Sequence, residues 1–187
     1  MRALLAFLCL LLAAPLAHSQ ALPLDSQGKV SFYEVVPADS LRAGTLYAHA
    51  KRWLAHHGYQ VSTADSAAGR LVATQALAMY DRGYLTKKLH GKVRYQLMLE
   101  VKNGRYRLEF NNFIFDYYQE DRAYRLVPTG KTKPLEDSLA TGWQKLWQSH
   151  RHDTLLGINS LQADLKTAML AVAKAPVAAP QARSATW

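Results

Sequence analysis

Residues 95–110, YQLMLEVKNGRYRLEF, carry the pattern that decides the fold. Asn103-Gly104 lies near the middle, and this dipeptide is typical of two-residue hairpin turns because both turn positions take a positive φ there. In the register that such a turn sets, Glu100 lies opposite Arg107, which is a favourable charge pair. On the other face three apolar pairs result: Val101 with Tyr106, Leu99 with Leu108, and Leu97 with Phe110. The stretch therefore predicts a long antiparallel hairpin with one apolar face.

The aromatic residues that follow Phe110 change from even to odd positions, at Phe113, Phe115 and Tyr117. One extra residue in the strand returns them to the apolar face, and this is the effect of a β-bulge. We therefore predict a bulge at Asn111-Asn112. The resulting register pairs Tyr95 with Phe113 and Val93 with Phe115.

A strand and a helix are predicted before this hairpin. Residues 29–36 are rich in β-branched and aromatic side chains and are stopped by Pro37, which indicates a strand. Asp39 or Ser40 is a suitable cap for the helix that follows, and Gly58 ends it. The apolar positions of the helix recur at intervals of three and four: Ala43, Leu46, Tyr47, Ala50, Trp53 and Leu54.

The remaining segments supply further strands and a helical C-terminal part. Residues 60–65 predict a short strand and residues 70–80 a longer one, whereas residues 119–133 predict a polar loop that holds a short strand at 124–127. Two helical stripes follow, which belong to one helix or to a pair of helices. The first consists of Leu139, Trp143, Leu146, Trp147 and His150, and the second of Leu155, Ile158, Leu161, Leu165, Met169 and Val172.

The order strand, helix, four strands and C-terminal helix or helices is typical of an α+β architecture, with helices on one face of an antiparallel twisted sheet. Two stretches, Leu46-Tyr47 through Trp53-Leu54 and the VKNGRYR hairpin within residues 95–107, give the chain a resemblance to the domain of unknown function 4468 family. That family consists of bacterial envelope proteins described as having a TATA-binding-protein-like (TBP-like) fold. The resemblance covers about residues 29–172 and implies a TBP-like β-α-β(4)-α order. It rests on structural motifs, so it does not identify a reaction or site residues, and the name of the fold says nothing about DNA.

The first residues have the features of a secretory signal. Arg2 precedes an apolar run of about a dozen residues, and Ala17-His18-Ser19 places small residues before a cut at Gln20, or alternatively after Ala21. The run is shorter than the roughly 20 residues that a membrane-spanning helix needs, so an uncleaved anchor is the weaker interpretation. We expect residues 1–19 to be removed, which gives an exported protein, periplasmic or on the outer surface, without a transmembrane span.

The composition bounds what the exported chain can be. Its 49% hydrophobic and 20% charged residues suit one folded domain, expected at residues 29–172. Residues 20–28 predict a flexible lead and residues 173–187 a disordered Ala/Pro-rich tail. The single cysteine, Cys9, lies in the signal segment, so the mature chain has no thiol nucleophile, thiolate ligand or disulfide.

No catalytic, metal or cofactor motif emerges from the sequence. There is no Gly-x-Ser-x-Gly elbow and no glycine-rich phosphate loop, and the acidic cluster of Asp116, Glu120 and Asp121 has basic neighbours in Arg122 and Arg125, which favours ion pairs. The mature histidines lack a ligand spacing, and we expect structural or solvated roles for them. They are His49, His56, His57, His90, His150 and His152. We therefore expect a protein that is not an enzyme and holds no cofactor and no metal.

The positive charge is concentrated in one part of the chain. The formal net charge is +9, and residues 81–107 hold eight basic residues against two acidic ones. These cations either keep a strand surface soluble or bind an anionic envelope component, since charge clusters of this kind attract anions. Nucleic acid is not expected in the exported compartment. The candidate basic residues are Arg82, Lys87, Lys88, Lys92, Arg94, Arg105 and Arg107.

An aromatic cluster offers a second interpretation. The aromatic face of the hairpin and the C-terminal helix either pack together as the hydrophobic core or enclose a pocket for a small apolar ligand or lipid. The candidate pocket residues are Tyr106, Phe110, Phe113, Phe115, Trp143 and Trp147. The leading hypothesis is a binding domain that uses its basic surface, the alternative is a small-molecule or lipid carrier, and an enzyme built on Asp116, Glu120 and a histidine comes third. The sequence predicts no oligomeric state.

Overall fold

A computed structural model describes residues 21–81 and 88–171 of the chain. The predicted signal segment 1–19 and the predicted tail 173–187 lie outside the described residues, and so do Arg82 and Lys87 of the basic set.

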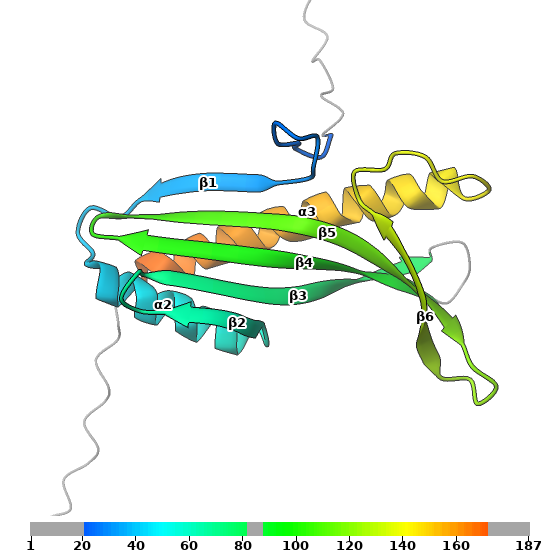
Figure 1. The fold of residues 1–187 in the computed structure, drawn as a ribbon, viewed down its shortest axis with the longest axis horizontal. Coiled ribbons are helices and arrows are strands. Elements are labelled where there is room, and N and C mark those ends of the chain that lie inside the picture. The colour runs from blue at the N-terminus through cyan, green and yellow to red at the C-terminus, as the bar shows by residue number, and fades with distance from the viewer. Residues whose placement is uncertain (1–20, 82–87, 172–187) are drawn as a thin grey trace, which may run out of the picture.

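The described residues form an antiparallel sheet and two helices (Figure 1). In chain order the elements are β1 (Phe32–Pro37), α2 (Ala43–His56), β2 (Gln60–Asp65), β3 (Arg70–Asp81), β4 (Lys88–Lys102), β5 (Arg105–Glu120), β6 (Leu126–Pro134) and α3 (Gln144–Leu170). The sheet order is β1-β5-β4-β3-β2, and β6 also pairs with β5. Both helices lie on one face of the sheet, so the predicted α+β class is confirmed.

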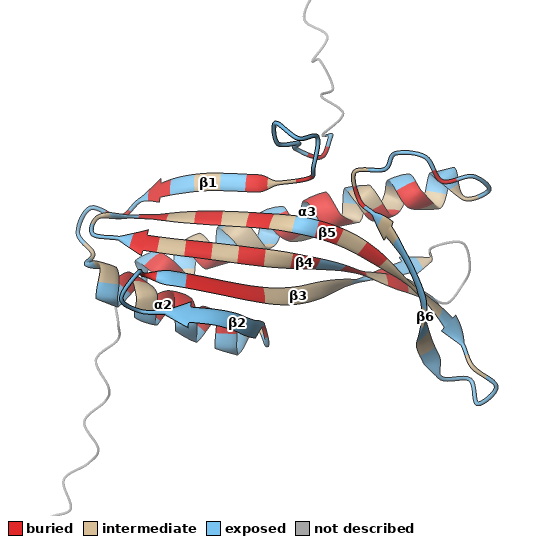
Figure 2. Cartoon of the chain, in the orientation of Figure 1, coloured by how far each residue is buried: buried red, intermediate tan, exposed pale blue. Residues whose placement is uncertain are grey.

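The predicted hairpin register is confirmed. Val101 pairs with Tyr106, Leu99 with Leu108, Leu97 with Phe110 and Glu100 with Arg107. A shift in register between Arg94 and Gln96 confirms the bulge, but Asn111 pairs with Gln96, so Asn112 and Phe113 are the two residues opposite Tyr95 and the predicted pair of Tyr95 with Phe113 alone does not form. Asn112 has a φ of 53° there. Beyond the bulge Val93 pairs with Phe115 as predicted. The apolar side chains of both strands therefore face the helices, and alternate positions on β4 and β5 are buried (Figure 2).

Two details of the turn and the first helix differ from the prediction. Only Gly104 has a positive φ, of 76°, so the turn has the φ pattern of type II and not of type I′. The residue that caps α2 is Arg42, in place of Asp39 or Ser40, and its side chain makes no capping hydrogen bond. The cap comes instead from the hairpin turn, because the backbone N–H of Ala43 donates to Asn103 Oδ1 at 2.9 Å. A long-range contact thus caps the start of the helix.

Replacing Asn103 by alanine should lower the free energy of unfolding by about 1 kcal/mol, since it removes the acceptor for a helix N-terminal N–H. Replacing it by aspartate keeps an acceptor at the same place and should leave most of the stability. Urea denaturation of the two variants measures both values. Equal losses for Asn103→Ala and Asn103→Asp would contradict the capping role of this side chain.

The short strand predicted within the loop at residues 119–133 is longer than expected and begins later. Residues 119–133 are not mainly a loop, because β5 continues to Glu120 and β6 covers 126–134 in place of the short strand at 124–127. Pro128 is tolerated in β6, opposite Tyr118, because β5 is the one strand that β6 pairs with in the described part of the chain, so no N–H is needed for a second neighbour. Five strands therefore follow α2, whereas the predicted order counted four.

The C-terminal stripes belong to one helix, α3, that runs without a break through His152-Asp153. Its buried residues include Trp147, Ile158 and Leu165. Leu139, which the first stripe included, lies before the helix and is 74% exposed. The helix begins only at Gln144, after a turn at Gly142 with a φ of 85°.

Candidate functional site

The sheet face turned away from the helices carries much of the basic set. Lys92 and Arg94 on β4 and Arg105 and Arg107 on β5 alternate with the buried positions of the same strands and so point to this open face. The face also carries the acidic residues Glu100, Glu109 and Asp116, which occupy the same alternate positions. Which cations are available to a ligand therefore depends on which of them are paired.

The cations in the middle of the sheet and in the half far from the β4–β5 turn contact carboxylates or an aromatic ring. Arg94 donates two hydrogen bonds to Asp116, at 3.1 and 3.0 Å, and this contact raises the pKa of Arg94. Lys88 forms an ion pair with Glu120 at 3.1 Å. Lys92 lies over the ring of Tyr118, with 5.3 Å between its Nζ and the ring centroid. The predicted basic set is thus divided, and its far part is largely neutralised.

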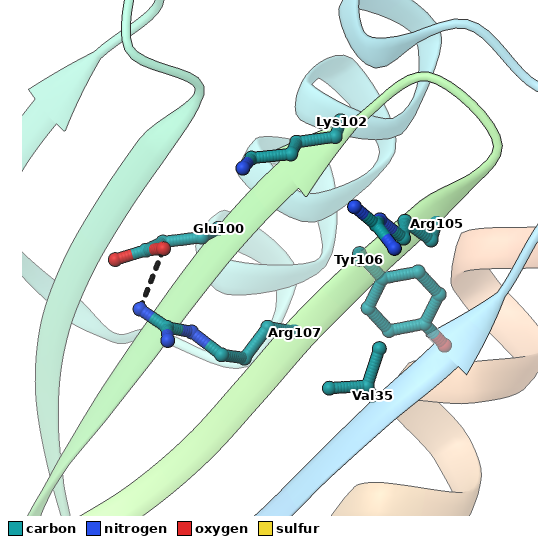
Figure 3. A pocket seen from close by; sticks show the side chains of 6 residues that line it. All are labelled: Val35, Glu100, Lys102, Arg105, Tyr106 and Arg107. Carbon is teal, nitrogen blue, oxygen red and sulfur yellow. Dashed lines mark ion pairs between the residues drawn. The ribbon is translucent and has the colours of Figure 1, made fainter.

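At the other end, next to the β4–β5 turn, the open face forms a shallow groove of about 210 Å³. Figure 3 shows its lining, which consists of Val35, Glu100, Lys102, Arg105, Tyr106 and Arg107. Arg107 is held by Glu100 at 2.6 Å. Within residues 21–81 and 88–171, Lys102 and Arg105 have no carboxylate partner, so their charges are available to a bound group.

The groove has the chemistry of a small anion site. A lysine ammonium supplies a compact positive charge, and an arginine guanidinium supplies a planar fork of donors that matches a carboxylate or a phosphate. Val35, which is 48% exposed, adds an apolar wall. Burial raises the pKa of Tyr106 to about 12, so its hydroxyl stays neutral and adds no negative charge. Lys102 was not among the candidate residues from the sequence, which counted it only toward the charge of its region.

The six candidate pocket residues separate into core groups. Phe113 stacks on Tyr95, with centroids 5.7 Å apart, and Phe110 lies 5.8 Å from the same ring. Phe115 instead packs against Trp143 and Trp147, at 6.0 and 5.6 Å. Tyr106 lies at the opposite end, beside the groove. Because the rings fill the space between the sheet and α3 with one another, this arrangement gives the carrier alternative no support.

A histidine pair that the sequence did not predict lies beside Phe115. His90 Nδ1 is 2.9 Å from His150 Nε2, and His150 is fully buried. Burial lowers the pKa of His90, which keeps the ring neutral among the aromatic side chains. The two histidines are 60 positions apart in the sequence, so no local sequence pattern predicts their contact. Among the described residues no group of three or more His, Cys, Asp or Glu side chains is placed to hold a metal ion.

The acidic cluster is held in ion pairs, partly with partners other than those predicted. Asp121 pairs with Arg125 at 2.8 Å, whereas Asp116 and Glu120 pair with Arg94 and Lys88 on the neighbouring strand. Arg122 takes no part in these pairs.

A polar pocket of about 410 Å³, which the sequence does not predict, lies where the bulge of β5 meets the N-terminal lead. Its lining includes Gln96, Glu109, Asn111, Asn112 and Glu136. Glu109 accepts a hydrogen bond from Asn111 Nδ2 at 2.9 Å, and Glu136 is paired with Lys29. The two carboxylates of this pocket therefore have partners within the protein, whereas Asn111 Oδ1 is buried without a hydrogen-bond partner.

Comparison with known proteins agrees with the fold. Residues 32–116 match the family model described as a domain of unknown function (DUF4468) with TBP-like fold. A DUF4468 family protein from Bacteroides ovatus superposes with a TM-score of 0.63 at 16% identity, over 84% of this chain and 95% of that one. A TBP-like protein from Parabacteroides distasonis gives a TM-score of 0.60 at 16% identity, over 79% and 96% of the two chains. At such identities these structures show the fold alone.

No curated protein matches the chain. Neither of the described helices, α2 and α3, is both long and apolar enough to cross a membrane.

Proposed function

We propose a function from the surface of this chain, because the DUF4468 family model that residues 32–116 match is described by a fold and by no reaction. The protein is an exported, non-enzymatic binding domain that holds an anionic component of the bacterial envelope in the groove beside the β4–β5 turn. Export rests on the signal features of residues 1–19, and binding rests on the groove.

The observation that carries this proposal is the pair of cations, Lys102 and Arg105, that have no carboxylate partner in the described part of the chain. Other strand cations on the same sheet, such as Arg94 and Arg107, are matched with a carboxylate. Cations placed only for solubility have no reason to converge on one concave site, whereas a site for a carboxylate or phosphate requires that convergence. The groove accommodates a single anionic group and not a large ligand.

The test is the affinity of the protein for inorganic phosphate and for glucuronate, measured by calorimetry at about 0.15 M salt, where the Debye length is about 8 Å. The double variant Lys102→Glu/Arg105→Glu should weaken binding of the anion by at least about tenfold, since it replaces two charge-assisted contacts by repulsion. Phosphate bound more tightly than glucuronate would indicate a phosphate-bearing component, and the reverse order an acidic polysaccharide.

A matched control separates the groove from net charge. Lys51 on α2 and Lys145 on α3 are exposed on the helical side, and Lys51→Glu/Lys145→Glu changes the net charge by the same amount. This control should stay within about twofold of the wild-type affinity, because exposed charges beyond a Debye length are screened. Equal weakening in both variants, or no binding by the wild-type protein, would show that the groove is not the site.

A further inference from the structure

The hairpin of β5 and β6 extends beyond the body of the sheet and ends in an exposed tip (Figure 1). At the tip the N–H of Asp121 donates to the carbonyl of Arg125 at 2.9 Å, and the N–H of Tyr124 donates to the carbonyl of Asp121 at 3.0 Å. Asp121 Oδ1 accepts the N–H groups of Ala123 and Arg125 as well. These bonds close a three-residue loop, residues 122–124, through backbone groups and the Asp121 carboxylate.

Tyr124 occupies the one position of this loop that disfavours a side chain. Its φ of 56° lies in the left-handed region, and only Asn112 shares that feature among the other non-glycine residues described. A three-residue hairpin loop places glycine at this position as a rule, because a Cβ there is crowded by the backbone. Tyr124 is also 87% exposed, so it gains almost no packing inside the molecule. The fold itself would be served better by glycine.

The surroundings of Tyr124 show what its side chain would meet outside the molecule. Leu126, two residues on, is 40% exposed, and Arg122 is exposed on the same loop. The two acidic residues nearby are neutralised, Asp121 by Arg125 and Glu120 by Lys88. An exposed tyrosine, an aliphatic side chain and an excess arginine are the composition of segments that bind the interface of an anionic membrane.

We propose that residues 121–126 form a contact element that inserts Tyr124 and Leu126 among the headgroups of an anionic phospholipid membrane. Arg122 binds the phosphates there. This element is separate from the groove, since residues 108–120 of β5 lie between the two, a strand length of about 40 Å. It holds the protein at a membrane surface while leaving the groove accessible.

The experiment is sedimentation of the mature chain, from Gln20 onward, with vesicles of phosphatidylglycerol and phosphatidylcholine, compared between variants so that other parts of the chain contribute equally. Tyr124→Gly should lose most of the vesicle binding while its thermal unfolding midpoint stays equal or rises, because the strained position is relieved. Arg122→Gln should weaken binding about fivefold, the effect of one charge near an anionic surface. The control Tyr33→Ser removes an exposed tyrosine at the groove end and should bind as the wild type does.

Three outcomes would overturn the proposal. The first is vesicle binding by Tyr124→Gly equal to that of the wild type. The second is equal binding of the wild-type chain to vesicles of pure phosphatidylcholine, which would remove the role of lipid charge. The third is that Lys102→Glu/Arg105→Glu loses vesicle binding while Tyr124→Gly keeps it, which would make the groove the membrane contact. If the groove variant loses only phosphate or glucuronate binding, the two proposals stand independently.

Discussion

Replacing Phe115 by alanine is expected to lower the free energy of unfolding by about 3–5 kcal/mol. The ring is fully buried and lies at the centre of an aromatic cluster. Trp147 lies 5.6 Å from it and His150 stacks on it at 5.4 Å, while Tyr117 and Trp143 close the sides. Because these rings come from both the sheet and α3, they cannot all move into the space that alanine would leave. The cost therefore includes a cavity as well as lost burial.

Urea denaturation followed by far-UV circular dichroism measures this loss as a shift of the midpoint. Phe115→Leu fills most of the same volume and should cost clearly less than the alanine variant. A loss of under about 1 kcal/mol for Phe115→Ala would mean that the helix and the sheet close over the site, and the cluster would then not hold α3 in place.

The position of Phe115 is the part of the fold that the sequence predicts best. The parity change after Phe110 requires an extra residue, and the bulge at Asn111-Asn112 follows from that count alone. Local patterns suffice here because a strand with one buried face has a fixed period, and a one-residue slip would expose every aromatic side chain. The hairpin register is predictable for the same reason.

Features that depend on contacts distant in sequence could not be predicted in this way. Asn103 caps α2 from 60 residues away, so the helix start does not follow from its neighbours. The strand β6 is stabilised by pairing with β5, and that pairing overrides the loop signals of Pro128 and Gly130.

The candidate site was likewise predicted only in part. The sequence identifies the basic residues of β4 and β5, and a hairpin places them on one face. It cannot show that Arg94 is matched with Asp116 while Arg105 has no carboxylate partner among the described residues, because each pairing depends on side chains of neighbouring strands. The availability of a charge, which decides whether it can bind a ligand, is a property of the packed sheet.

Gly91 is a second residue whose importance only the packed sheet reveals. The register of β3 and β4 shifts between Met79 and Tyr80, which leaves His90 as the extra residue beside Gly91. A Cβ at Gly91 would lie 2.4 Å from Phe115 Cζ and 2.5 Å from the backbone oxygen of Asp116. Neither neighbour can retreat, since the ring is surrounded by the aromatic cluster and the backbone oxygen belongs to the paired strand β5.

Gly91→Ala is therefore expected to lower the free energy of unfolding by about 3 kcal/mol or more, in the upper range for overpacked cores. The matched control is Gly44→Ala in α2, where a Cβ meets nothing within 4 Å and the better helix propensity of alanine should raise stability by roughly 0.5–1 kcal/mol. Combining Gly91→Ala with Phe115→Leu removes the nearest ring atom, so the double variant should lose less than the sum of the two single losses. Denaturant midpoints of the four proteins measure this coupling. Strictly additive losses would mean that the ring is not the obstacle, and a Gly91→Ala protein as stable as the wild type would contradict the close approach of β4 to β5 at this point.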